Sequence, residues 1–216
     1  MRGLRLAATA FLLISMARAA AFSVFMTGDS HVSSRVYPER VGDILVDADP
    51  EIEFDYHGKA GAGFYTFNDE SSLMRRIYAA EPDILIVHLG TNDSYTRRFD
   101  SGKFTADIYE FYRNVREHCP EAQVVFVTPF YNKLKGSREV NGNTRACSDA
   151  ILEFARGKEG VYVIDNNADH GMDFLNGGHR LINHDNVHLT PEGYKELGDQ
   201  VGQALIDIED LWTNSL

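Results

Sequence analysis

The chain has 216 residues, of which 44% are hydrophobic and 25% are charged. This composition excludes an intrinsically disordered protein, and the length suits one domain with a single sizeable core. Acidic residues outnumber basic residues by 32 to 21, which gives a formal net charge of −11. Such an acidic surface argues against nucleic acid or an anionic membrane as a partner, and we expect neither nucleic-acid binding nor stable membrane insertion.

The N-terminal segment has the pattern of an export signal. A basic start is followed by an apolar stretch over residues 6–16, and Ala17-Arg18-Ala19 matches a cleavage site. The alternatives are a core helix or a membrane anchor, but the stretch is shorter than the roughly 20 residues that cross a bilayer. We therefore predict a signal peptide over residues 1–19, a mature domain over residues 20–216, and a secreted or periplasmic location.

Apolar runs alternate with segments of helical periodicity along the rest of the chain. Five runs are predicted to be strands: Phe22–Met26, Ile52–Tyr56, Ile84–Leu89, Val124–Thr128 and Val161–Ile164. The predicted helices between them are Pro38–Val46, a helix capped by Asn68 and running to Ala80, Phe104–His118 and Thr144–Arg156. A last helix begins with Thr190 as cap and Pro191 at its first position, and runs through Ile208.

Strands that alternate with helices predict a parallel sheet covered by helices on both faces. By analogy with doubly wound proteins, we expect a three-layer α/β/α sandwich with a flavodoxin-like, five-stranded parallel sheet in the order 2-1-3-4-5. Ligands of such sheets bind beyond the carboxyl ends of the strands, so the residues that follow each strand are the first candidates for chemistry.

A serine meets this condition, and a histidine with a nearby carboxylate lies in the closing loop before the last predicted helix. Thr27-Gly28-Asp29-Ser30 directly follows the first strand, and Asp185-Asn186-Val187-His188 places a carboxylate three residues before an imidazole. Within one turn this spacing lets the carboxylate hold the Nδ1 proton, while Nε2 acts as a base toward a hydroxyl. Taken alone, each motif has a plainer interpretation, as a helix N-cap and as a surface loop pair.

Two further segments offer hydrogen-bond donors at the same edge. Gly58, Gly61 and Gly63 follow the second strand, and glycine lets a backbone N–H approach a ligand closely. Asn92 follows the third strand and offers a side-chain amide. With the N–H of Ser30, these donors can form an oxyanion hole. The four motifs occur in the required chain order with distinct roles, which favours a serine hydrolase.

On these residues the chain resembles the SGNH (GDSL-like) hydrolases, whose four blocks are matched by Gly28-Asp29-Ser30, Gly61, Gly90-x-Asn92-Asp93 and Asp185-x-x-His188. The resemblance implies Ser30 as nucleophile and first oxyanion donor. It implies Gly61, whose Gly-x-x-Gly-Ala pattern aligns best, as second donor and Asn92 as third. His188 would be the general base and then the acid, oriented by Asp185. No metal or cofactor is implied.

The residue after the serine bears on the substrate. His31 stands where many relatives carry Leu or another apolar residue, and Gly-Asp-Ser-His resembles the motif of peptidoglycan and polysaccharide O-acetylesterases. This implies acetylated glycans as substrate and His31 as a substrate-binding residue; the alternative is a partly exposed residue on the first helical turn. Arg97 and Arg98 are candidates for binding a substrate carboxylate, or are two solvated arginines on an acidic surface.

We therefore expect a serine esterase that hydrolyses short-chain esters, acetyl foremost, on an acylated small molecule or polysaccharide. The alternatives are a lysophospholipase- or thioesterase-like acylhydrolase, acetyl transfer to a glycan, and a noncatalytic glycan-binding relative. The other histidines have no recognisable metal-ligand spacing. Cys119 and Cys147 either form a disulfide in an exported chain or remain as two buried thiols.

Overall fold

The computed structural model describes residues 22–96, 98–130, 138–168 and 180–212, so the predicted signal peptide and Arg97 lie outside the described residues. Five parallel strands form one sheet in the order β2-β1-β3-β4-β5, as predicted. Their bounds lie within two residues of the predicted ones: β1 Phe22–Gly28, β2 Ile52–Gly58, β3 Ile84–His88, β4 Gln123–Val127 and β5 Val161–Ile164.

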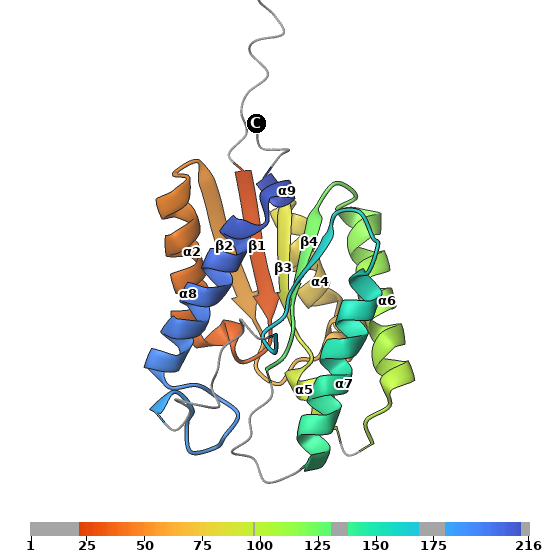
Figure 1. Cartoon of the computed structure of the whole chain (residues 1–216). Coiled ribbons are helices and arrows are strands. Elements are labelled where there is room, and N and C mark those ends of the chain that lie inside the picture. The colour runs from red at the N-terminus through yellow and green to blue at the C-terminus, as the bar shows by residue number, and fades with distance from the viewer. Residues whose placement is uncertain (1–21, 97, 131–137, 169–179, 213–216) are drawn as a thin grey trace, which may run out of the picture.

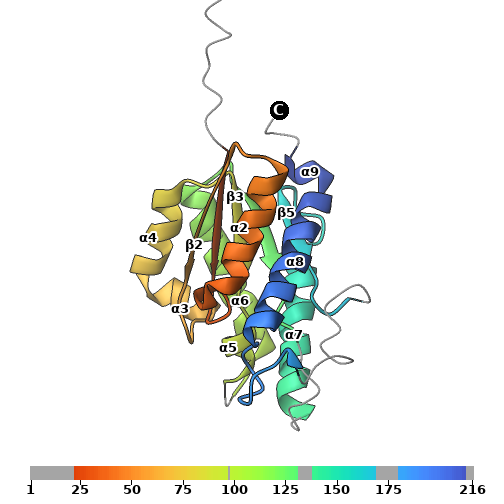
Figure 2. The ribbon, with the colours of Figure 1, turned by 90° about the vertical axis from the view of Figure 1, so that its left-hand side faces the viewer.

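Helices cover both faces of this sheet, which confirms the three-layer sandwich (Figures 1 and 2). One face carries α2 (Val36–Ala48), α8 (Pro191–Asp207) and α9 (Glu209–Trp212). The other carries α3 (Phe64–Asp69), α4 (Ser71–Ala80), α6 (Ser101–His118) and α7 (Arg138–Ala155). The short helices η1 (Val32–Ser34) and α5 (Thr91–Ser94) follow β1 and β3. No helix among the described residues is long and apolar enough to cross a membrane.

Side chains alternate between the two faces of the sheet along each strand, so they contribute to two hydrophobic cores. On β1, Phe25 packs with the α4 and α6 side, whereas Val24 and Met26 pack with α2 and α8. Every residue of β3 and β4 is buried, because helices cover the central strands on both faces. Burial of each large apolar side chain stabilises the fold by about 1.5–3 kcal/mol relative to its exposure.

The helix cap predicted at Asn68 is wrong. Asn68 lies inside α3, and the predicted single helix is two helices that are separated at Glu70. The Asn68 side-chain amide donates a 2.9 Å hydrogen bond to the backbone carbonyl of Asp107 on α6. A partner from a distant helix thus replaces the local capping bond. The cap predicted at Thr190 is confirmed, because its hydroxyl accepts a 3.2 Å bond from the N–H of Gly193.

The two cysteines are free, buried thiols, so the second of the two alternatives holds. Cys147 lies on α7 beneath Gly90, where an added Cβ would stand 3.7 Å from the Cβ of Cys147. Burial raises the pKa of both thiols, which keeps them protonated and unreactive.

Candidate active site

Ser30 lies in a tight turn between β1 and η1, at the carboxyl end of the sheet. This is the end toward which the strand arrows point in Figure 1. Two glycines let this turn pack onto the sheet. A Cβ on Gly28 would lie 2.5 Å from the carbonyl oxygen of His88, and one on Gly58 would lie 2.2 Å from the backbone nitrogen of Ser33. Since no side chain fits at either position, the glycines hold the serine close to the strand ends.

A continuous chain of hydrogen bonds joins Ser30, His188 and Asp185. His188 Nε2 lies 2.9 Å from Ser30 Oγ, and His188 Nδ1 lies 2.6 Å from Asp185 Oδ2. The other carboxylate oxygen, Asp185 Oδ1, accepts bonds of 2.8 and 2.9 Å from the backbone N–H groups of Val187 and His188. The structure therefore brings together three predicted site residues from opposite ends of the chain.

The electrostatic state of Asp185 suits the role of an orienting carboxylate. Burial by itself raises the pKa of Asp185, but hydrogen bonds from the His188 side chain and from the backbone of Val187 and His188 hold it at about 2. The carboxylate is thus ionised at neutral pH and favours a proton on His188 Nδ1. Nε2 then offers its lone pair to the hydroxyl of Ser30.

The loop that carries His188 is tied to the base of α8. Ile182 and Leu189 form an antiparallel bridge, and the N–H of Asn183 donates to the carbonyl of His188 at 2.8 Å. The side-chain amide of Asn183 donates to the carbonyl of Leu189 at 2.9 Å. Ile182 and Leu189 are buried in the core under α8, so the imidazole is held by packing as well as by hydrogen bonds.

The three candidate glycines after β2 have different environments. Gly58 packs under the turn of Ser30, and a Cβ on Gly63 would lie 2.5 Å from the carboxylate of Asp93. Gly61 is exposed, has φ +78°, and would place a Cβ in open space. Neither its N–H nor that of Ser30 donates a hydrogen bond to any described residue. Gly58 and Gly63 therefore have packing roles, whereas the N–H of Gly61 is available to a ligand.

Asn92 connects the glycine loop with the turn of the serine. Its side-chain amide donates to the carbonyl of Ala62 at 2.9 Å and lies 3.5 Å from Asp29 Oδ2. The first contact fixes the amide beside Gly61, while the second is long and weak. The side-chain amide has two N–H groups. The one that faces Asp29 can instead donate a hydrogen bond to an oxyanion, while the other keeps its bond to Ala62.

The family of this chain follows from its sequence as a whole. The model of the GDSL-like lipase/acylhydrolase family matches residues 25–196. The chain belongs to this family. The GDSL-like hydrolase is accordingly an ester hydrolase, and the matched residues include all five of those placed above: Ser30, Gly61, Asn92, Asp185 and His188.

Solved structures share the fold of the GDSL-like hydrolase. A peptidoglycan O-acetylesterase has a TM-score of 0.72 at 11% identity, with coverage of 93% of this chain and 95% of that chain. A catalytic mutant of an acetylxylan esterase from Geobacillus stearothermophilus has a TM-score of 0.72 at 16% identity, with coverage of 90% of this chain and 97% of that chain. A family 3 carbohydrate esterase from Clostridium thermocellum has a TM-score of 0.68 at 16% identity, with coverage of 90% of this chain and 99% of that chain. No curated protein sequence matches the chain.

A buried layer of aromatic side chains underlies the site of the GDSL-like hydrolase. His31 is 0% exposed, which corrects the interpretation of a partly exposed residue on the first turn. Its Nδ1 lies 3.3 Å from the hydroxyl of Tyr194, and its ring stacks on His88 with centroids 5.7 Å apart. His88 Nδ1 lies 3.1 Å from the hydroxyl of Tyr37. A side chain so enclosed acts on a substrate only through its neighbours.

Sequence reasoning did not assemble this layer. In the sequence, His88 belongs to the histidines without a recognisable metal-ligand spacing, Tyr37 immediately precedes the predicted helix Pro38–Val46, and Tyr194 lies within the last predicted helix. The apolar spacing of α2 and α8 was the available signal, and it does not say which distant residues a phenol meets. Arg98 is exposed and lines a cavity to which none of the three hydrogen-bonded residues contributes. No cluster suited to a metal ion is found among the described residues.

Proposed function

We propose that this GDSL-like hydrolase is a serine esterase that removes short acyl groups, acetyl foremost, from glycans. The observation that carries the proposal is the hydrogen-bond chain from Asp185 through His188 to Ser30, with distances of 2.6 and 2.9 Å. Distances of this size allow a proton to move between the hydroxyl and the imidazole without any rearrangement of the loops.

The first half of the proposed reaction acylates the enzyme. Ser30 Oγ attacks the ester carbonyl carbon while His188 Nε2 takes the hydroxyl proton, and the carbonyl oxygen becomes an oxyanion. The N–H groups of Ser30, Gly61 and Asn92 bind this oxyanion. When the carbon–oxygen bond to the alcohol breaks, His188 returns the proton to the departing oxygen, and the acyl group stays on Ser30.

The second half returns the enzyme to its starting state. His188 takes a proton from a water molecule, whose oxygen attacks the acyl carbon and forms a second oxyanion in the same site. Breakage of the bond to Ser30 Oγ releases the carboxylic acid, and the proton on His188 returns to the serine. Throughout both halves the ionised Asp185 stabilises the protonated imidazole.

Two observations support a short acyl group on a glycan. The Gly-Asp-Ser-His sequence ending at His31 resembles that of carbohydrate O-acetylesterases. Structures with the same fold act, by their own names, on peptidoglycan O-acetyl groups and on acetylxylan. We carry these substrates over to this chain as a proposal on its substrate class.

The test compares acyl chains of increasing length and then acetylated polymers. We expect hydrolysis of p-nitrophenyl acetate well above that of longer p-nitrophenyl esters, and acetate release from an acetylated xylan or peptidoglycan. Ser30→Ala should lower the rate by about 10⁴-fold or more while its thermal unfolding stays that of the wild type. Comparable rates on long chains would favour a lysophospholipase or thioesterase instead.

Covalent labelling separates an enzyme from a noncatalytic relative. A serine-directed fluorophosphonate should modify the wild type at Ser30 and leave Ser30→Ala unmodified. Folded wild type that stays unlabelled would contradict the esterase proposal, because an activated serine is the one group this reagent requires.

We further propose that residues 1–19 direct export and that the mature enzyme begins at Ala20. The support is the basic start, the apolar stretch and the Ala17-Arg18-Ala19 motif. N-terminal sequencing of protein recovered outside the cytoplasm should begin at Ala20. Recovery of a chain that retains Met1 in the cytoplasm would contradict this part of the proposal.

A further inference from the structure

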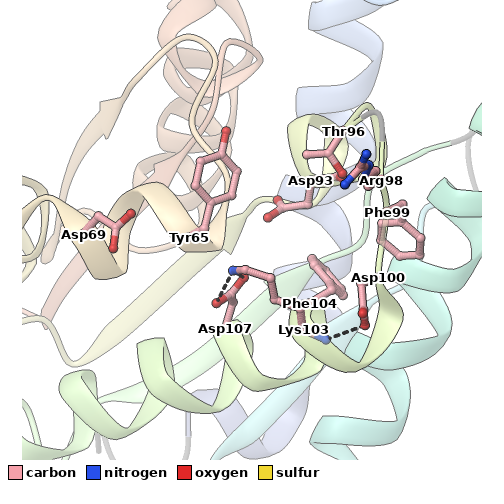
Figure 3. Close-up of a pocket in the computed structure, with 10 residues that line it drawn as sticks. All are labelled: Tyr65, Asp69, Asp93, Thr96, Arg98, Phe99, Asp100, Lys103, Phe104 and Asp107. Carbon is pink, nitrogen blue, oxygen red and sulfur yellow. Dashed lines mark hydrogen bonds and ion pairs between the residues drawn. The ribbon is translucent and has the colours of Figure 1, made fainter.

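A cavity of about 380 Å³ lies between α3, α5 and the start of α6 (Figure 3). No residue proposed to carry the reaction lines it. Its walls nevertheless continue the two donor segments, because Tyr65 follows Gly61 by four residues and Asp93 directly follows Asn92. The N–H of Phe64 donates to Asp93 Oδ1 at 3.2 Å, which joins the two walls. The cavity is therefore on the side of the site that carries the oxyanion donors.

Aromatic rings form the apolar part of this cavity. Figure 3 shows Tyr65, from α3, on one side and Phe99 on the other, with Phe104 of α6 between them. Phe104 is 3% exposed and its ring centroid lies 6.2 Å from that of Phe99. Tyr65 and Phe99 are half-buried, so each keeps part of its ring open to a ligand.

Charged groups of both signs line the cavity, with more acidic than basic ones: the carboxyl groups of Asp69, Asp93, Asp100 and Asp107, and the basic groups of Arg98 and Lys103. Lys103 Nζ binds both carboxylate oxygens of Asp107, at 2.8 and 3.1 Å. Arg98 and Asp69, one of each sign, form no ion pair with a residue in the described part of the chain. Burial raises the pKa of Asp93 to about 7, so near neutral pH this carboxyl can donate as well as accept a hydrogen bond.

This composition discriminates between classes of ligand. An anion would meet the carboxylates of Asp69 and Asp107, and a cation would meet Arg98 and Lys103. A long acyl chain would take these charged groups out of water without giving them partners. A neutral ring with hydroxyl groups avoids both the charge repulsion and the loss of hydrogen-bond partners. Its C–H face packs on aromatic rings, and its hydroxyls form hydrogen bonds with carboxyl and guanidinium groups. The volume is within the range of organic-ligand sites, about 300–1,000 Å³.

We propose that this cavity binds a neutral pyranose unit of the glycan chain, beyond the unit that carries the ester. The inference rests on the proposed function, because it takes the substrate to be a glycan. It also gives Arg98 a partner other than a substrate carboxylate, namely the hydroxyl groups of a neutral sugar.

Binding to an inactive variant tests this without any need for turnover. Ser30→Ala protein is titrated by calorimetry with xylohexaose, with chitohexaose and with a hexamer of galacturonic acid, none of which carries an O-acetyl ester. We expect at least one neutral hexamer to bind, and the uronate hexamer to bind more weakly. Adding Phe99→Ala or Arg98→Ala should raise the Kd about fivefold or more. Arg98 is exposed, so its truncation carries little risk to folding.

Tyr109→Ala is the matched control, because Tyr109 is an aromatic residue of α6 that is 51% exposed and does not line the cavity. Its Kd should stay that of the Ser30→Ala parent. The proposal is overturned if neither neutral hexamer binds, if the uronate binds more tightly, or if both cavity variants keep the parental Kd. An active wild-type esterase without such binding contradicts the cavity alone, whereas binding without esterase activity contradicts the proposed function.

Discussion

The ring of His31 lies against that of His188, with centroids 5.8 Å apart and planes inclined by 51°. His31 is fully buried, whereas 39% of the His188 side chain is exposed. Burial lowers the pKa of His31 to about 3, and the nearby His188 adds to this effect. The proposed base thus rests on a neutral imidazole, which does not repel the positive charge that His188 takes up during the reaction.

Removal of His31 should change how stability depends on pH. Its pKa is about 3 in the folded chain and 6.5 by reference, so between these values the unfolded chain binds more protons. The contribution of the neutral His31 to the free energy of unfolding is therefore complete above pH 6.5 and is lost as the pH falls toward 3. Relative to wild type, the unfolding free energy of His31→Leu should rise by about 1 kcal/mol per pH unit from pH 6 to pH 4. Urea unfolding at several pH values measures this, and a constant difference would contradict it.

Asp93 should show the opposite dependence. Burial raises its pKa from 3.8 to about 7, so the folded chain binds more protons between these values. Its contribution is present below pH 3.8 and is lost as the pH rises through 7. Since Asn stays neutral, the unfolding free energy of Asp93→Asn relative to wild type should rise by about 1 kcal/mol per pH unit from pH 5 to pH 7. Denaturant unfolding of both proteins at several pH values measures this difference. A difference in unfolding free energy that stays constant from pH 5 to pH 7 would count against the raised pKa.

Replacement of Asp185 by Asn should reduce kcat strongly. An amide cannot stabilise the protonated imidazole and can hold the wrong tautomer, so we expect a loss of about 10²–10⁴-fold on p-nitrophenyl acetate. Glu192→Gln is the control, because Glu192 is a nearby carboxylate that pairs with Arg180 and does not contact His188. Equal activity of the two variants would remove Asp185 from the proposed mechanism.

Loss of the amide at Asn92 should slow the chemical step more than it weakens binding. We expect Asn92→Ala to lower kcat by about 10²–10³-fold with little change in KM, since the oxyanion exists only in the transition state and intermediates. Asn114→Ala, on α6 and outside the site, should keep the wild-type kcat. An increase in KM at constant kcat would instead indicate that Asn92 binds the substrate in its ground state.

The sequence by itself determined the positions of the strands and the order of the site motifs along the chain. Apolar runs alternating with helical segments predicted all five strands within two residues, and the sheet order 2-1-3-4-5, expected by analogy with doubly wound proteins, is confirmed. The pairing of Asp185 with His188 was predictable because it forms within a single turn, where spacing along the chain decides which groups meet. The cap at Thr190 is local in the same sense.

Only the tertiary structure decided the roles that depend on distant packing. Asn68 has the sequence of a cap but bonds to α6. Gly58 and Gly63 differ from Gly61 in what a Cβ would strike, and of the three only Gly61 has a positive φ. The burial of His31 results from the convergence of β3, α8 and the loop after β4, which no local pattern encodes. Burial and steric fit are properties of several segments at once, so they become visible only after the chain has folded.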